Sequence, residues 1–343
     1  MTVSEPPVLL DVEDLRVWFD ARSEVVRAVD GIDLTIRAGE TVCLVGESGC
    51  GKSVTGLALM RLIDPPGRIQ EGSRITFEGK DLLGLSEREM EGIRGNDIAM
   101  VFQEPMSSLN PVQTVGAQIV EAVRLHNDVS RKTARVQAEE TLALVGIPSP
   151  KQRMGNYPHE MSGGMRQRVV IAMAIVCRPK LLIADEPTTA LDVTVQAQIV
   201  ELLEQLQDEF GMSLLHITHD LGLVAETADR VAVAYGGRVV EEGSAARIFG
   251  HPQHPYTQAL LGSIPVLGMT QAHPLSVIRG MVPAGAHWPS GCRFAPRCDH
   301  SFDRCAKYPP AFESSPSQSA ACWLCESGPR PLTTHPTAGL ADG

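Results

Sequence analysis

A glycine-rich loop is the clearest chemical feature of the 343-residue sequence. The string GESGCGKS, at 46–53, fits the pattern GxxxxGK[ST]; it follows the apolar run 41–45 and precedes a segment predicted to be a helix from Val54. Glycines let backbone N–H groups curve around a phosphate, and the start of a helix adds partial positive charge. This order of strand, motif and helix disfavours an accidental glycine-rich turn. Lys52 is expected to reach the outer phosphates and Ser53 to bind Mg²⁺. The residues expected to bind the nucleotide are Gly46, Glu47, Ser48, Gly49, Cys50, Gly51, Lys52, Ser53 and Val54.

Two adjacent carboxylates follow a second apolar run. The string KLLIADEP, at 180–187, is typical of a buried strand that ends in Asp185 and Glu186. Open α/β sheets collect their ligands at the carboxyl ends of their strands. Asp185 would hold Mg²⁺ through water, and Glu186 would polarise an attacking water. Alone, the pair would read as a solvated loop before Pro187, but beside the glycine loop it indicates hydrolysis of a bound phosphate.

The elements that must position these residues suit an α/β protein. Continuous apolar runs before each motif favour strands buried on both faces of a parallel sheet. Helical patterns run from Ser130 to Val145 and from Val195 to Glu209, and a helical insertion is expected over about 104–176. From about residue 250 the sequence turns to proline-rich and cysteine-rich loops and a Pro, Thr and Gly tail. We therefore expect one domain over 1–250 and a small, loop-rich domain over 251–343 that ends in a flexible tail.

Composition narrows the class of protein. Hydrophobic residues make up 43% and charged residues 21%, as in ordinary globular proteins. The formal net charge of −11 disfavours nucleic acid as the main partner. No stretch reaches the roughly 20 apolar residues that cross a bilayer, and the N-terminus lacks the apolar core of a signal peptide. These features predict a cytoplasmic protein that would reach a membrane only by docking.

Further motifs resemble those of the ATP-binding cassette (ABC) ATPases. The string MSGGMRQR, at 161–168, is similar to the signature that separates these proteins from other phosphate-loop enzymes. The resemblance covers about residues 8–260, with each motif in the family's order, and implies a P-loop nucleotide-binding domain with an inserted helical subdomain. One departure is Met165, where most ABC proteins have glutamine. The matching residues are Phe19 (adenine stacking), Gln103 (Q-loop), Ser162, Gly163 and Gly164 (signature), Asp192 in TALD at 189–192 (D-loop) and His219 (switch histidine).

The resemblance implies that two such subunits share their ATP. The signature turn at 162–164 would bind the γ-phosphate of ATP held by a second subunit, so that two nucleotides lie in a head-to-tail dimer. Gln103 would reach Mg²⁺ and the attacking water, while His219 would contact the γ-phosphate and support Glu186. For His219 alone, a buried core histidine is the ordinary alternative. For Phe19, which follows Trp18, packing in the core stays open beside adenine stacking.

Several strings resemble the oligopeptide and dipeptide importer branch of the family, in its D-type subunit. They are QEPMSSLNPV at 103–112, YPHEMSGGM at 157–165, DEPTTALDVTVQAQI at 185–199 and HPQHPYTQALLGSIP at 251–265. The resemblance implies an ATPase at the cytoplasmic face of the cell membrane that powers peptide uptake. Its implied partners are a second, homologous ATPase chain, two transmembrane permease subunits and, indirectly, an extracytoplasmic substrate-binding protein. Nickel importers share much of this pattern and remain an alternative.

Two other classes of ABC protein fit the sequence less well. ABC ATPases of DNA repair or chromosome organisation usually interrupt the cassette with long coiled coils or zinc modules, and no sustained heptad or insertion separates Gly46 from Asp185. Translation-factor ABC proteins generally carry two cassettes, whereas each motif occurs once here.

Five cysteines crowd the C-terminal region. Without an export signal they favour thiols or metal ligands over disulfides. Structural zinc usually shows paired C-x₂₋₄-C knuckles, and only Cys322 with Cys325 fits, whereas iron–sulfur clusters tolerate varied spacing. GCRFAPRC at 291–298 resembles the peptide-importer C-terminal region, where some relatives hold a four-iron four-sulfur (4Fe-4S) cluster; zinc and plain thiols are the alternatives. The ligands implied by this resemblance are Cys292, Cys298, Cys305 and Cys322.

Overall fold

The structure is a computed structural model that describes residues 6–21, 24–104, 108–189, 191–264, 278–283, 285–315 and 317–328. Contacts between residues divide the chain into two units, which interleave along the sequence. Unit one is Met1–Val8, Arg37–Glu40 and Gly84–His216; unit two is Leu9–Ile36, Thr41–Leu83 and Ile217–Gly343. The predicted boundary near residue 250 stays a prediction.

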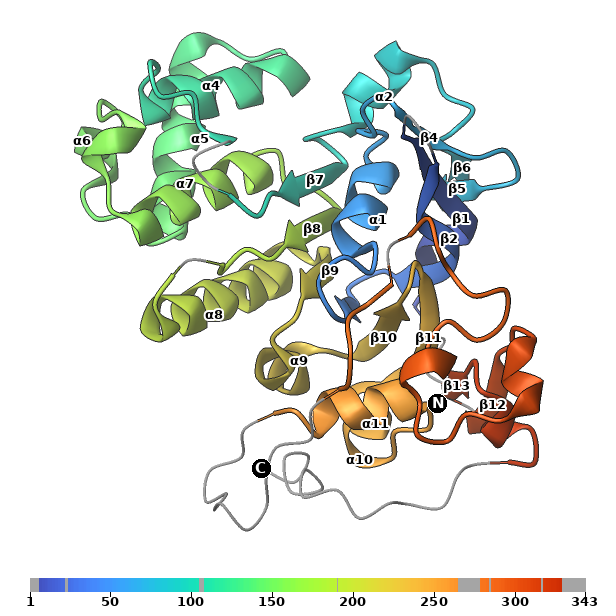
Figure 1. Cartoon of the computed structure of the whole chain (residues 1–343). Coiled ribbons are helices and arrows are strands. Elements are labelled where there is room, and N and C mark those ends of the chain that lie inside the picture. The colour runs from blue at the N-terminus through green and yellow to red at the C-terminus, as the bar shows by residue number, and fades with distance from the viewer. Residues whose placement is uncertain are drawn as a thin grey trace, which may run out of the picture. The chain divides into compact units, whose positions relative to one another are not determined.

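Unit one joins a buried strand pair to a group of helices (Figure 1). Strand β7 pairs in parallel with β8, with Ile98 opposite Leu181. Every residue of both strands is buried, as expected of parallel strands covered on both faces. The elements are α2 (Glu87–Ile93), β7 (Ile98–Val101), α4 (Val115–His126), α5 (Arg131–Leu144), α6 (Pro150–Arg153), the 3₁₀ helix η1 (Pro158–Glu160), α7 (Gly163–Ile175), β8 (Leu181–Asp185), α8 (Val193–Phe210) and β9 (Ser213–Thr218), which crosses into unit two.

Polar residues act as N-caps of the main helices of unit one, and apolar faces of these helices pack together. Ser130, Thr114 and Asp192 each accept a hydrogen bond from a backbone N–H in the first turn of α5, α4 and α8. One hydrophobic cluster contains Ile119 of α4, Leu142 of α5 and residues of α7, α8, β7 and β8. The helices predicted over 130–145 and 195–209 are confirmed, with ends one or two residues away. Every element described within 104–176 is helical.

Unit two contains an antiparallel sheet and part of a second sheet. The antiparallel sheet has the order β2-β1-β5-β6, and β4 also pairs with β1. In the second sheet the order β12-β13-β11-β10-β3 combines a parallel pair, β10 with β3, with antiparallel pairs beyond it. The strands are β1 (Val8–Asp20), β2 (Val25–Arg37), β3 (Thr41–Val45), β4 (Gly67–Ile69), β5 (Arg74–Phe77), β6 (Lys80–Asp81), β10 (Arg230–Tyr235), β11 (Arg238–Ser244), β12 (Phe312–Ser315) and β13 (Gln318–Ala320).

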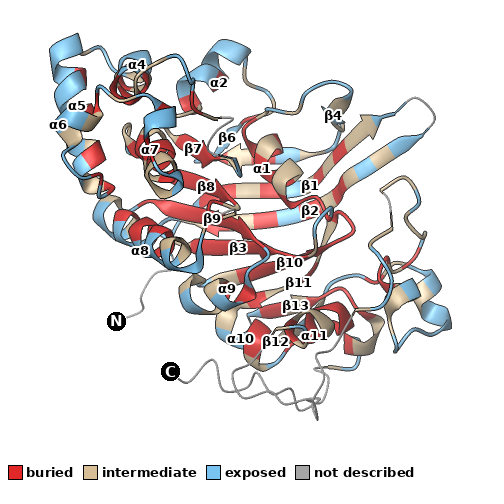
Figure 2. Ribbon diagram, turned by 60° about the vertical axis from the view of Figure 1, so that its left-hand side comes forward, coloured by how far each residue is buried: buried red, intermediate tan, exposed pale blue. Residues whose placement is uncertain are grey.

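The helices of unit two are short. Figure 1 places α10 and α11 beside β10 and β11, and Figure 2 shows β3 and β10 buried. The helix predicted from Val54 begins two residues earlier, because Gly51 adopts a left-handed conformation and acts as its N-cap. The helices are α1 (Lys52–Leu59), α9 (Leu221–Thr227), α10 (Ala245–Gly250), α11 (Pro255–Leu261) and the 3₁₀ helices η2 (Ala295–Arg297), η3 (Asp303–Ala306) and η4 (Trp323–Cys325). In the described part of the chain, no helix is both long and apolar enough to cross a membrane.

Candidate functional site: a phosphate loop, a carboxylate pair and a signature turn

The glycine loop of unit two connects β3 to α1, as the sequence predicts. A Cβ atom on Gly46 would lie 2.2 Å from the carbonyl oxygen of Ala234, and one on Gly51 would lie 2.3 Å from that of Ala28. Both glycines also have positive φ angles, of 152° and 98°. Since backbone atoms cannot yield as a flexible side chain does, only glycine fits at these two positions.

Lys52 lies against the inside of the loop. Its side chain is buried, and its Nζ donates hydrogen bonds to the carbonyl oxygens of Gly46 (2.8 Å) and Glu47 (3.1 Å). Ser48 and Gly49 are exposed at the tip, and Ser53 and Val54 are half-buried in the first turn of α1. The N-cap residue of α1 is Gly51, which has no side chain to accept from the first N–H groups of the helix. A loop with these donors can bind an anion such as a phosphate.

In unit one, two residues predicted separately lie in contact. Asp185 is buried at the end of β8, and the next residue, Glu186, has a φ angle of 45°. The Oε2 atom of Glu186 accepts hydrogen bonds from Gln103 Nε2 (3.2 Å) and from Thr189 Oγ1 (2.9 Å). The structure thus brings Gln103 to the carboxylate that would polarise water, although 83 residues separate them.

The signature turn lies at the start of α7. The Ser162 hydroxyl oxygen accepts a hydrogen bond from the N–H of Met165 (3.3 Å), so its own O–H can still donate to a ligand. A Cβ on Gly164 would lie 2.9 Å from Val195 Cγ1, at the start of α8, and Asp192 caps that helix by accepting from Val195 N–H at 3.0 Å. The signature and the D-loop residue therefore lie side by side within unit one.

Ala190 of the D-loop lies outside the described residues, as do 105–107 of the string at 103–112 and Pro265 of the string at 251–265.

Phe19 and His219 are in unit two. Phe19 pairs with Gly67 across β1 and β4, and a Cβ on Gly67 would lie 2.5 Å from the Phe19 ring. Phe19 is half-buried, so part of it is packed and part is accessible to a ligand. His219 is exposed immediately after β9, which makes the alternative of a buried core histidine wrong.

Four of the five C-terminal cysteines line one cavity of unit two, together with Phe294, Trp323 and other side chains. Burial, with smaller contributions from the nearby Cys305 and Cys322, raises the pKa of the Cys292 thiol to about 11. No group of three or more His, Cys, Asp or Glu side chains among the described residues is arranged to hold a single metal ion. Cys325 is buried outside the cavity and directs its sulfur toward the carbonyl oxygen of Gln253 (3.9 Å). The lining cysteines are Cys292, Cys298, Cys305 and Cys322.

Comparison with known proteins identifies the family. A family model described as "ABC transporter" matches residues 29–189, and one described as "Oligopeptide/dipeptide transporter, C-terminal region" matches residues 240–305. The chain is 51% identical over 317 residues to the probable peptide ABC transporter ATP-binding protein y4tR of Sinorhizobium fredii. The alignment covers 92% of this chain and 95% of that protein. It is 52% identical over 303 residues to the dipeptide transport ATP-binding protein DppD of Escherichia coli, covering 88% and 92%. The chain belongs to the ABC transporter family.

A solved structure confirms the predicted α/β fold class of this ABC protein. The dimeric structure of the ATP-binding cassette MJ0796, in a post-hydrolysis state bound to ADP and Pi, aligns with it at a TM-score of 0.62 and 26% identity. The alignment covers 69% of this chain and 99% of that chain.

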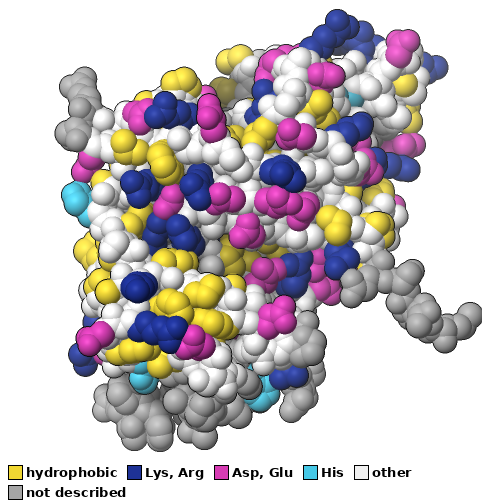
Figure 3. Space-filling view, turned by 90° about the vertical axis from the view of Figure 1, so that its right-hand side faces the viewer, with side chains coloured by type: hydrophobic (Ala, Val, Ile, Leu, Met, Phe, Trp, Pro, Cys, Tyr) yellow, Lys and Arg dark blue, Asp and Glu magenta, His cyan; other side chains and the backbone are white. Residues whose placement is uncertain are grey.

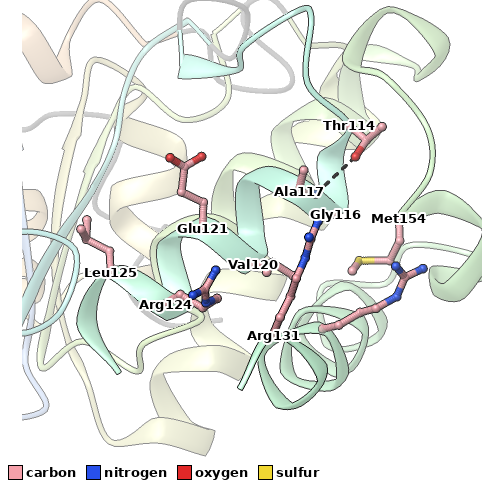
Figure 4. Close-up of a pocket in the computed structure, with 10 residues that line it drawn as sticks. Thr114, Gly116, Ala117, Val120, Glu121, Arg124, Leu125, Arg131 and Met154 are labelled. Atoms are coloured by element: carbon pink, nitrogen blue, oxygen red, sulfur yellow. Dashed lines mark hydrogen bonds between the residues drawn. The ribbon is translucent and has the colours of Figure 1, made fainter. Parts of the chain in front are cut away.

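Figures 3 and 4 show two other features of the surface of the ABC protein. Figure 3 shows basic and acidic side chains intermixed on one face, in keeping with exposed ion pairs such as Arg68 with Asp20 (3.1 Å). A pocket in the helices of unit one contains none of the predicted site residues (Figure 4). Its lining residues are Thr114, Gly116, Ala117, Val120, Glu121, Arg124, Leu125, Arg131, Arg135 and Met154.

Sequence reasoning missed two residues that touch the phosphate loop. Arg297 forms an ion pair with Glu47, and the Tyr256 hydroxyl accepts a hydrogen bond from the Glu47 N–H. Both belong to strings that suggested the peptide-importer branch, HPQHPYTQALL and GCRFAPRC. The available sequence signal is the position of Arg297 between the predicted metal ligands Cys292 and Cys298. The spacing of these residues does not connect Arg297 with Glu47.

Proposed function

We propose that this chain is the ATP-binding and ATP-hydrolysing subunit of an ABC importer that takes up dipeptides and oligopeptides. The observation that carries the proposal is the likeness along nearly the whole chain to proteins named peptide or dipeptide transport ATP-binding proteins. The match of residues 240–305 to the C-terminal region of oligopeptide and dipeptide transporters supports the same cargo class.

The chemistry of ATP follows from the residues of each unit. In unit two, the loop amides and Lys52 bind the phosphates, Ser53 binds Mg²⁺, His219 contacts the γ-phosphate and Phe19 stacks on the adenine. In unit one, Asp185 would hold Mg²⁺ through water, and Gln103 would reach the same ion. Glu186 accepts a proton from the attacking water, and the Gln103 and Thr189 donors hold its carboxylate in place.

A second ATPase chain completes each site. Ser162, Gly163 and Gly164 donate to the γ-phosphate of ATP bound by that partner, which we take to be a homologous, distinct chain. Asp192, beside the signature, belongs to the same surface. Closure of this dimer would move two transmembrane permease subunits, with the ATPase held at the cytoplasmic face of the membrane and the substrate delivered by an extracytoplasmic binding protein.

Reconstitution in lipid vesicles tests this function. The chain, co-purified with its permease subunits and partner ATPase, is assayed for uptake of a radiolabelled dipeptide and for ATP hydrolysis in the presence of the binding protein. We expect ATP-dependent peptide uptake that disappears when Glu186→Gln replaces the native chain. Uptake of Ni²⁺ without peptide uptake would show that the cargo assignment is wrong. Co-purification with ribosomes or DNA, rather than with membrane subunits, would contradict the transport function itself.

We further propose that the four cavity cysteines hold a 4Fe-4S cluster. Such a cluster needs four thiolates, each bound to a different iron, so the sulfurs need not meet at one point as around a single ion. The shared cavity supports this, because its lining brings together the four cysteines that would supply the thiolates. When bound, the cluster would cross-link a loop-rich segment that has little core of its own.

The cluster can be tested with two matched serine variants. After anaerobic purification, the native chain is expected to contain iron and acid-labile sulfide in equal amounts. Cys298→Ser should lose most of both, whereas Cys325→Ser should retain them because Cys325 lies outside the cavity. Zinc without sulfide, or equal losses in the two variants, would contradict the proposal.

A further inference from the structure

An ion pair joins the phosphate loop to the cysteine-rich segment. Arg297 Nη1 and Nη2 donate to the two carboxylate oxygens of Glu47, at 2.6 and 3.0 Å, across 250 residues of sequence. Glu47 follows the first glycine of the loop, and Arg297 immediately precedes Cys298, which lines the cysteine cavity. Both residues belong to unit two. Two parallel hydrogen bonds of this kind fix the relative orientation of the two groups as well as pairing their charges.

The guanidinium of Arg297 has little freedom to move. Its side chain is only 5% exposed. Besides Glu47, it donates to the carbonyl oxygens of Arg279 (2.8 Å) and Gly280 (3.3 Å) and to the hydroxyl of Tyr235 (3.3 Å). Each nitrogen atom of the guanidinium therefore has an acceptor, and the group holds the Glu47 carboxylate in a fixed position.

A tyrosine holds the backbone of the same loop residue. The hydroxyl of Tyr256, in α11, accepts a hydrogen bond from the N–H of Glu47 at 2.8 Å. Tyr256 is fully buried and packs against Tyr235 (ring centroids 4.6 Å apart) and Phe294 (5.4 Å). Phe294 lies in the cysteine segment and also lines the cysteine cavity. Both the side chain and the backbone of Glu47 are thus held by residues beyond position 250.

The far side of the loop is held by the same segment. Arg293, one residue after Cys292, donates to the carbonyl oxygen of Gly236 in the turn between β10 and β11. The next residue of that turn, Gly237, donates its N–H to the carbonyl oxygen of Cys50 at 3.0 Å. The two arginines of GCRFAPRC therefore support the phosphate loop at Glu47 and, through the turn, at Cys50.

We propose that Arg297 and Tyr256 are positioning residues for ATP, an inference that rests on the proposed ATP binding by the loop. Neither residue needs to touch the nucleotide. Arg297 neutralises a carboxylate that would otherwise stand unpaired beside a polyanionic ligand, and with Tyr256 it fixes the start of the loop before the ligand arrives. Ordering a loop in advance reduces the entropy lost on binding, and charge pairing removes a repulsion that falls with distance.

Steady-state kinetics on the assembled transporter test the proposal. For Arg297→Ala, the KM for ATP is expected to rise about tenfold while kcat changes by less than about twofold, because the lost interactions act on binding. Arg297→Lys, which keeps the charge but not the two parallel hydrogen bonds, should raise KM about threefold. The matched control is Arg304→Ala, since Arg304 forms the same kind of pair with Glu326 in the cysteine-rich segment (Nη2 to Oε1, 2.7 Å) without contacting the loop. It should leave KM unchanged.

A second variant separates a positioning role from general loss of structure. Adding Glu47→Gln to Arg297→Ala removes the unpaired carboxylate and should lower KM again by about threefold. Tyr256→Phe, which keeps the ring but not the hydroxyl, should raise KM by about threefold without altering kcat; it serves if Arg297→Ala fails to fold. Any one of three results would overturn the inference. They are a KM as high in Arg304→Ala as in Arg297→Ala, no recovery of KM in the double variant, and a native KM in Tyr256→Phe. If the native chain itself binds no ATP, the proposed function fails instead.

Discussion

The carboxylate of Glu186 shows how single residues prepare the chemistry. Its backbone adopts a left-handed conformation that non-glycine residues rarely adopt, and its side chain accepts from two donors within unit one. Such strain persists only where the surrounding structure holds it, and it is concentrated at functional positions. The strained backbone at Glu186 is therefore consistent with a functional role for its carboxylate.

At this scale we expect Glu186→Gln to retain ATP and to lose turnover. The amide keeps the size of the side chain but is no longer a base, so hydrolysis should fall by at least about a hundredfold. ATP binding by isothermal titration and phosphate release by the assembled complex measure the two effects separately. Glu209→Gln, at an exposed position near the end of α8, is the control and should behave as the native chain. Unchanged turnover in Glu186→Gln would mean that another group acts as the base.

At the scale of elements, β2 is tied to the cysteine-rich segment through Asp30. Its carboxylate accepts from Arg293 and from the indole N–H of Trp18 (3.2 Å), and Arg238 lies 3.7 Å away. Burial alone would raise the pKa of Asp30, but the hydrogen bond and charge of Arg293, with Arg238 and Trp18, hold it below the usual value of 3.8. Because the folded state binds this proton less tightly than the unfolded state, the pair stabilises the fold above about pH 4.

Asp30→Asn should therefore cost about 3 kcal/mol of unfolding free energy at pH 7, since it leaves the buried arginine without its charged partner. The difference from the native chain should shrink as the pH falls through 3.8 and below, where the native carboxylate takes up a proton. Urea unfolding between pH 7 and pH 3 measures it. Asp20→Asn, at an exposed pair with Arg68, should cost less than about 1 kcal/mol. Equal costs in the two variants would contradict the argument.

The sequence predicted those elements whose pattern is local. Apolar runs before residues 46 and 185 correctly indicated buried strands, and the glycine spacing predicted the loop between β3 and α1. Contacts between distant segments have no local sequence pattern that predicts them. The hydrogen bonds of Arg297 with Glu47 and of Gln103 with Glu186 form only because the fold brings these residues together. The spacing of the cysteines alone also could not exclude Cys325 from the cysteine cavity. The structure excludes it, because Cys325 lies at the end of η4 and is not among the lining residues.

At the scale of the whole molecule, this chain is expected to supply one half of its partner's ATP site. Ser162→Ala should lower turnover of the assembled complex at least about tenfold, because it removes a donor to the partner's γ-phosphate. It should leave ATP binding by the isolated chain unchanged. Ser130→Ala removes an N-cap of the same kind, from α5 (Thr133 N–H to Ser130 Oγ, 3.1 Å), and should reduce stability without lowering turnover. Equal turnover in the two variants would argue against a shared site.

The pairing of β13 with β11 has a consequence for solubility. Residues 318–320 cover the backbone of Glu241–Gly243, and the outermost strand, β12, is only four residues long and carries a register shift. Short, irregular outer strands resist pairing with other molecules. A chain cut before residue 312 would leave the seven-residue β11 as the border of its sheet. Such a border offers open hydrogen-bonding groups to any neighbouring strand, so the C-terminal hairpin also protects the protein against self-association into aggregates.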